Sequence, residues 1–146
     1  MLSVYCDASL IVASLARERH TDAALAWFER QPPGSLAISP WVVTEVAGAL
    51  SQKSRAREID ESHRLVLRRT WDALITSSLD PIAIEDRHFT RATEFLDQPG
   101  INLRAGDALH LAIAAENRLA IATLDRRMGD AALLLGIDVA MSPPAN

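Results

Sequence analysis

The sequence has very little cysteine and lysine, and it has no long apolar run. Cys6 is the only cysteine, so the chain forms no internal disulfide, and a small buried residue in the first strand is the expected role. The longest apolar stretches, near 10–16 and 111–115, are too short to span a bilayer, and the first residues lack the basic start of an export signal. These absences predict a cytoplasmic protein without a membrane segment.

Composition otherwise describes an ordinary folded domain. The chain has 146 residues, of which 49% are hydrophobic and 23% charged, and it shows no internal repeat or linker, so we expect one domain over 1–146. The net charge of −4 argues against a nucleic-acid binder, in which a basic surface is the usual first sign. Lys53 is the only lysine, so nearly all positive charge is arginine, whose planar guanidinium suits phosphate.

Short apolar strands alternate with helical patterns along the whole chain. Ser39-Pro40 is a strong helix start, because serine caps and proline fits the first helical turn. Alternation of this kind predicts an α/β fold in which helices cover both faces of a mainly parallel sheet. The predicted strands are 2–6, 36–38, 81–84, 119–123 and 137–140, and the predicted helices include 8–19, 21–30, 58–77, 86–96, 104–116 and a helix from Asp125 through 135.

Two acidic residues follow predicted strands. Asp7 comes directly after the first strand, and Asp125 comes after the strand that ends near Thr123. In open parallel sheets, ligands bind beyond the carboxyl ends of the strands, which makes both residues site candidates. Capping of the helix that follows is the competing interpretation for each.

Two further acids lie in apolar surroundings. Glu45 interrupts an apolar stripe next to Val46, with Val42 and Ala49 one turn away on either side, although a solvent-facing position at the edge of the stripe explains it too. Asp107 begins a helix that is apolar on almost every face and is therefore expected to be buried. Its place in the first turn suits the helix dipole, but packing alone does not require an acid there.

Four acids gathered at one edge of a sheet would repel each other unless a cation joined them. Oxygen ligands without cysteine favour a hard cation, Mg²⁺ or Mn²⁺. A bound divalent ion would also offset much of the net charge of −4.

Four short motifs together resemble the PIN domain, and specifically VapC-type toxins of bacterial toxin–antitoxin pairs. The motifs are Tyr5-Cys6-Asp7-Ala8-Ser9, Thr44-Glu45-Val46, the stretch from Arg104 to Ala112, and Thr123-Leu124-Asp125. Ala8 departs from the hydroxyl residue often found there, while Ser9 supplies one. The resemblance implies a three-layer α/β/α sandwich with strand order 3-2-1-4-5, a metal-dependent endoribonuclease activity, a homodimer, and inhibition by a small antitoxin.

The resulting hypothesis is metal-assisted hydrolysis of RNA. Asp7 and Asp107 are the expected direct metal ligands, Asp125 holds a second ion or orients water, and Glu45 acts through water or helps to activate the nucleophile. The hydroxyls of Ser9 and Thr123 are expected to orient these carboxylates. Three arginines near the acids are candidates for contacts with RNA phosphates: Arg104, Arg126 and Arg127.

Several other residues receive a structural interpretation. His110 lies one helical turn after Asp107, and a packed core histidine is favoured over a metal ligand. His20, His63 and His88 stand in polar stretches and are predicted at the surface, as is Asp130.

Alternative functions remain open. A haloacid-dehalogenase-like phosphatase requires a second aspartate at the position of Ser9. A receiver domain requires a lysine after a late strand, whereas the only lysine, Lys53, lies in a different region. An inactive PIN-like binding module is a third alternative. For the antitoxin we expect an amphipathic helix on an apolar groove near Leu15, Trp27 and Phe28, with an arginine or lysine inserted among the acids.

Overall fold

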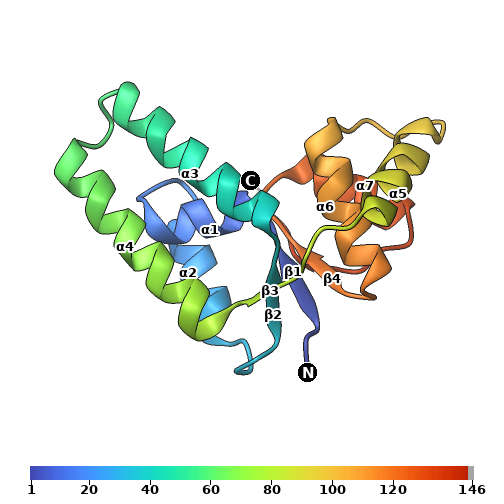
Figure 1. Cartoon of the computed structure of the whole chain (residues 1–146), viewed down its shortest axis with the longest axis horizontal. Helices are drawn as coiled ribbons and strands as arrows, with labels where there is room; N and C mark the ends of the chain where they lie inside the picture. The colour runs from blue at the N-terminus through green and yellow to red at the C-terminus, as the bar shows by residue number, and fades with distance from the viewer. Residues whose placement is uncertain (145–146) are drawn as a thin grey trace.

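A five-stranded, all-parallel sheet runs through the centre of the molecule (Figure 1). The structure is a computed structural model that describes residues 1–144. The strand order is β3-β2-β1-β4-β5, as the resemblance implied. The strands are β1 (Val4–Cys6), β2 (Leu36–Ile38), β3 (Asp80–Pro81), β4 (Ala120–Ala122) and β5 (Val139–Met141).

Helices cover the sheet on both sides and complete the predicted three-layer sandwich. Figure 1 shows α1, α2 and α4 on one side with most of α3, and α5, α6 and α7 on the other. The helices are α1 (Ala8–Leu15), α2 (Thr21–Glu29), α3 (Pro40–Arg55), α4 (Glu61–Ser78), α5 (Asp86–Asp97), α6 (Ala105–Glu116) and α7 (Arg126–Leu134).

The helix starts follow local signals in the sequence, but two helix boundaries differ from prediction by more than one residue. Ser39 caps α3 as expected, with its Oγ accepting from the Val42 amide at 3.5 Å. α4 begins at Glu61 rather than 58, because Asp60 caps it. α1 ends at Leu15 rather than 19, since the following turn is held by Thr21, whose hydroxyl accepts from the Glu18 amide.

The two outer strands are also displaced from their predicted positions. β3 consists of Asp80–Pro81 rather than 81–84; both residues are exposed at the sheet edge, where a proline without an amide donor is tolerated. β5 begins at Val139 rather than 137. Ile137 instead ends the turn after α7, where Gly136 has a φ of +76° and the Ile137 amide bonds the Ala132 carbonyl at 2.8 Å.

Burial confirms one prediction about the core and corrects two others. Cys6 is fully buried, and burial raises the pKa of its thiol, as suits a small core residue. His88 was predicted at the surface but is buried where α5 packs against α6, and its Nδ1 accepts from the Glu85 amide at the start of α5. Trp27 was predicted to line a docking groove, but it belongs to the core. Within residues 1–144, no helix is both long and apolar enough to cross a membrane.

Candidate active site

Two of the predicted acids follow the two central strands of the sheet. Asp7 comes directly after β1, and Asp125 lies just beyond β4. β1 and β4 are parallel neighbours, with Cys6 paired to Ala122. β2 flanks β1 on one side and β4 on the other, so the strand order reverses here. In open parallel sheets, this is the point at which ligands bind.

Asp7 is buried and held by three hydrogen bonds. Its Oδ1 accepts from the Ser9 hydroxyl at 2.7 Å and from the Leu10 amide at 3.2 Å, and its Oδ2 accepts from the Thr123 hydroxyl at 2.6 Å. Only 2% of the residue is exposed. Burial raises the pKa of Asp7, and the two hydroxyl hydrogen bonds oppose that rise.

The same two hydroxyls also bind the backbone that follows β4. The Ser9 hydroxyl accepts from the Leu124 amide, and the Thr123 hydroxyl accepts from the Asp125 amide, both at 2.9 Å. Each hydroxyl therefore donates to Asp7 and accepts from a backbone amide of the loop that follows β4. The predicted contact of Ser9 and Thr123 with a site carboxylate is present, while its catalytic importance stays a prediction.

Asp7 and Asp125 also cap helices, as the competing interpretation of each predicted. Asp7 caps α1 through the Leu10 amide. Asp125 caps α7, with its Oδ1 accepting from the amides of Arg127 at 2.9 Å and Met128 at 3.3 Å. Within residues 1–144, no hydrogen bond uses Oδ2 of Asp125. Capping therefore leaves one oxygen of Asp125 for another ligand.

Asp107 lies in the first turn of α6, where it is partly buried and close enough to other acids for their charges to affect it. Burial contributes most to raising its pKa, and the negative charges of Asp125 and Glu45 raise it further. His110 and Arg104 act in the opposite direction. Three of the four predicted acids, Glu45, Asp107 and Asp125, thus share one electrostatic environment, whereas Asp7 does not line the same cavity.

Glu45 on α3 is joined to His110 on α6 by a hydrogen bond between Oε1 and Nε2. His110 is 1% exposed, which confirms the prediction of a packed core histidine. Its bond to Glu45 was not anticipated. The only signal in the sequence was the position of His110 one helical turn after Asp107, on a neighbouring face of α6.

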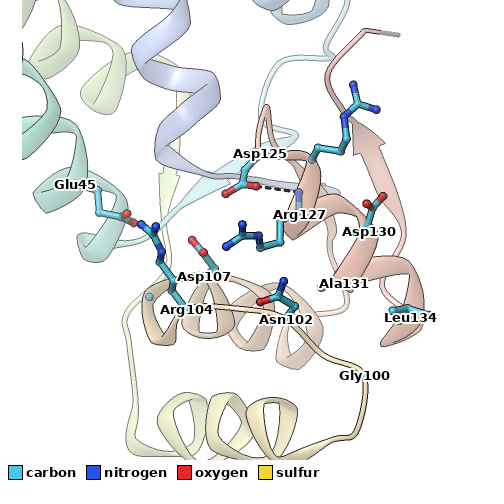
Figure 2. A pocket seen from close by; sticks show the side chains of 12 residues that line it. Glu45, Gly100, Asn102, Arg104, Asp107, Asp125, Arg127, Asp130, Ala131 and Leu134 are labelled. Carbon is cyan, nitrogen blue, oxygen red and sulfur yellow. Dashed lines mark hydrogen bonds between the residues drawn. The ribbon is translucent and has the colours of Figure 1, made fainter. Parts of the chain in front are cut away.

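A cavity of about 860 Å³ opens among these groups. Figure 2 shows the side chains of Glu45, Asp107 and Asp125 around it. The guanidinium groups of Arg104 and Arg127 extend among the carboxylates. Asp130 lines the same cavity but is exposed, as predicted. The remaining lining residues are Gly100, Asn102, Gly106, Arg126, Ala131 and Leu134.

The donor chemistry of the cavity fits a hard divalent cation. Its ionisable ligands are carboxylates, the oxygen donors that Mg²⁺ and Mn²⁺ prefer. Within residues 1–144, no three acidic, histidine or cysteine side chains stand close enough to hold an ion by themselves. The four predicted acids are therefore not gathered around one point, and an ion bound here would take only one or two carboxylates and keep several water ligands.

The chain belongs to the PIN domain family, whose model matches residues 4–134. No curated protein matches the sequence. The family match covers all four acids, both hydroxyls and the three arginines named above.

Several solved structures share the fold. Mycobacterium tuberculosis VapC20, described as a toxin that cleaves the sarcin–ricin loop, is 16% identical with a TM-score of 0.71 and covers 88% of this chain and 95% of its own. FitAcB from Neisseria gonorrhoeae is 17% identical with a TM-score of 0.71 and covers 93% and 95%. A toxin–antitoxin complex from Klebsiella pneumoniae is 25% identical with a TM-score of 0.61 and covers 84% and 87%.

The sheet order weighs against the receiver alternative. Receiver domains use the order 2-1-3-4-5, whereas this sheet is ordered 3-2-1-4-5. For the phosphatase alternative, position 9 holds a serine whose hydroxyl is engaged with Asp7 and Leu124. Because the chain belongs to the PIN family, neither the receiver nor the phosphatase alternative is retained.

Proposed function

We propose that this protein is a metal-dependent endoribonuclease that hydrolyses phosphodiester bonds of RNA. One observation carries the proposal: Glu45, Asp107 and Asp125 line a single cavity, connected through Thr123 to the buried Asp7, where the strand order reverses. Membership of the PIN family supports the nuclease class, and the sarcin–ricin loop cleaved by VapC20 supports RNA as substrate.

Each acid has a distinct role in this proposal. Asp7 and Asp107 are the direct ligands of Mg²⁺ or Mn²⁺, and Asp125 holds a second ion or orients a water through its free Oδ2. Glu45 acts through water or orients the attacking nucleophile. The ion, when bound, lowers the pKa of water and neutralises charge that builds on the phosphate. The fixed hydroxyls of Ser9 and Thr123 keep Asp7 in one orientation.

The arginines of the cavity supply the RNA contacts that the acidic net charge does not. Arg104, Arg126 and Arg127 line the cavity beside the acids. A guanidinium binds a phosphate oxygen pair through two parallel hydrogen bonds. Arg127→Ala should weaken RNA binding and flatten its salt dependence by about one unit of slope. Arg69→Ala, an exposed position on α4, is the control that should change neither.

The central test compares cleavage by four purified proteins. Wild type, Asp107→Asn, Glu45→Gln and Asp130→Asn are incubated with cellular RNA, with Mg²⁺ or Mn²⁺ and with EDTA. We expect wild type and Asp130→Asn to cleave only with metal. The activity of Asp107→Asn should fall by at least about a hundredfold, since an amide is a poor ligand for a hard cation. Glu45→Gln should fall by a similar factor, since an uncharged amide cannot replace the carboxylate that binds through water or orients the nucleophile. Metal-independent cleavage, or full activity of Asp107→Asn, would contradict the proposal.

We further propose a small antitoxin as partner, with the protein itself a homodimer. The similar structure from Klebsiella pneumoniae is described as a toxin–antitoxin complex, which supports an antitoxin as partner. The structures of VapBC2 from Rickettsia felis and of FitAB are described as bound to DNA fragments. Here, a groove of about 510 Å³ between α1, α2 and α4 includes Leu15, Leu25 and Phe28, two of which were predicted to form it. An amphipathic helix of the antitoxin fits this groove, and an arginine or lysine beyond it pairs with the carboxylates of the cavity.

The partner proposal is tested by copurification from the native cell. Leu25 is 41% exposed in the groove and Leu133 is 65% exposed on α7. Leu25→Asp should lose the antitoxin and keep RNA cleavage, whereas Leu133→Asp should keep both. Retention of the antitoxin by Leu25→Asp would refute the groove. An antitoxin that still inhibits after every arginine and lysine in its contacting segment is replaced would refute the pairing with the acids.

A further inference from the structure

Four side chains form a continuous hydrogen-bonded chain from the core to the cavity. The Tyr5 hydroxyl on β1 lies 2.7 Å from Ser39 Oγ and 2.7 Å from His110 Nδ1. His110 Nε2 in turn binds Glu45 Oε1. Ser39 and Tyr5 are fully buried and His110 nearly so, while a third of the Glu45 side chain is exposed. Of the four, only Glu45 reaches the cavity.

With a neutral imidazole at His110 and a carboxylate at Glu45, the protons along this chain have one consistent arrangement. The Tyr5 hydroxyl has a single proton to donate, and it lies within hydrogen-bond distance of both Ser39 and His110. Glu45 offers a carboxylate oxygen, which only accepts, so the proton between His110 and Glu45 belongs to Nε2. Nδ1 of a neutral imidazole is then an acceptor and takes the Tyr5 proton, while Ser39 donates to Tyr5. Every buried polar atom of the chain is satisfied in this arrangement.

Packing does not explain a histidine at this position. Residues 108–114 of α6 are all buried, and His110 is the only polar side chain among them. A buried imidazole is costly unless its nitrogens are bonded, and here both are. The role of His110 therefore lies in its hydrogen bonds to Tyr5 and Glu45, and of these two partners only Glu45 lines the cavity.

We propose that His110 is the positioning residue of Glu45, and that Tyr5 and Ser39 fix the tautomer that lets it act. The Nε2–H donor holds Oε1 toward α6 against the repulsion between Glu45 and Asp107. Within residues 1–144, Oε2 has no hydrogen-bond partner, so it alone is left for a water or an ion in the cavity. The catalytic consequence rests on the proposed nuclease function, whereas the hydrogen-bond arrangement does not.

The first experiment reads the tautomer directly in metal-free protein. The imidazole nitrogens of the full chain are observed by ¹⁵N NMR at neutral pH. We expect His110 with Nε2 protonated and Nδ1 an acceptor, and we expect Glu45→Gln to shift its Nε2 resonance while the exposed His63 is unchanged. A proton on Nδ1, either alone or together with one on Nε2, or a His110 resonance insensitive to Glu45→Gln, overturns the proposal.

The second experiment separates positioning from stability. Mn²⁺ affinity and RNA cleavage are measured for His110→Leu, His110→Gln, Tyr5→Phe and Leu111→Ala. Loss of a residue that orients a ligand typically costs about 10- to 100-fold in metal affinity or activity. We expect that loss in His110→Leu, a smaller one in Tyr5→Phe, and recovery in His110→Gln, whose amide supplies a donor. Leu111→Ala, buried on the same helix, should lower the melting temperature without changing Mn²⁺ affinity.

The outcomes distinguish this proposal from the nuclease function. Equal losses in His110→Leu and Leu111→Ala, or no recovery in His110→Gln, overturn the positioning role. If His110→Leu does not fold, Tyr5→Phe and the NMR comparison decide in its place. If wild type binds no Mn²⁺ and cuts no RNA, the nuclease proposal fails, and the tautomer experiment still decides the arrangement around Glu45.

Discussion

Replacing Asp7 by asparagine should stabilise the metal-free protein. Asp7 is 2% exposed, and within residues 1–144 no cationic side chain forms a salt bridge with it. Its charge is supported by hydrogen bonds from the hydroxyls of Ser9 and Thr123 and the amide of Leu10, and by the electrostatic effect of His110. Asparagine has the same shape, keeps an acceptor toward Ser9 and Leu10, and turns a donor toward Thr123.

The size of the effect follows from two opposing contributions. Removing the buried charge recovers a desolvation penalty of several kcal/mol. Three hydrogen bonds change from charge-assisted to neutral, which forfeits about 1 kcal/mol each. The remaining gain is roughly 1–2 kcal/mol in the free energy of unfolding. For a chain of this length, this corresponds to an increase of about 3–8 °C in melting temperature.

The pH dependence of the gain tests its cause. Burial raises the pKa of Asp7 in the folded protein above its unfolded value near 3.9. At a pH below that value the group is protonated in both states and the charge costs nothing. As the pH rises toward and through the folded pKa, wild type loses stability that Asp7→Asn retains. Denaturant unfolding in EDTA should therefore show a difference near zero at low pH and a full difference at pH 7.

The metal response completes this test. Mg²⁺ or Mn²⁺ binds the folded state and should raise the wild-type melting temperature, whereas Asp7→Asn should lose most of that increase. Asp130→Asn should retain the metal response, because Asp130 lines the cavity but is exposed and is not one of the proposed metal ligands. A variant that is less stable than wild type at every pH, or that responds fully to metal, would refute the reasoning about Asp7.

Two further predictions concern single side chains. Thr123→Val removes the hydroxyl that donates to Asp7, so cleavage should fall about 10- to 100-fold, and Thr123→Ser should restore most of it; equal activity of the two variants in a cleavage assay would exclude an orienting role. Trp71 is fully buried on α4, so Trp71→Ala should cost about 3–5 kcal/mol in denaturant unfolding. Val66→Ala, 56% exposed on the same helix, should change stability by at most about 0.5 kcal/mol, and a similar loss in both would contradict the packing of α4.

The sequence alone determined the features that depend on neighbours along the chain. The start of α3 was predicted because Ser39 and Pro40 carry their signal within a single turn. Asp7 and Asp125 were found because each directly follows an apolar strand, and an acid placed there is visible without knowing what lies beside it. The order of the strands came from the resemblance of the motifs to a family and not from periodicity.

Burial of isolated residues was decided only by the tertiary structure. His88 stands among polar neighbours in the sequence, yet it is buried at the start of α5. Trp27 was predicted to face a groove, but helix packing places it in the core, whereas Phe28 beside it lines the groove. Local polarity describes one segment, while burial depends on which other segment covers it, and that information lies elsewhere in the chain.

The arrangement of the site likewise needed the folded chain. Thr123 donates to Asp7 across 116 residues, and His110 binds Glu45 across 65. These bonds depend on the register between β1 and β4 and on how α3 approaches α6, which no local window contains. The sequence could therefore identify the acids by their chemistry, but hydrogen bonds require atoms within about 3 Å of each other, and only the packing of distant elements brings them that close.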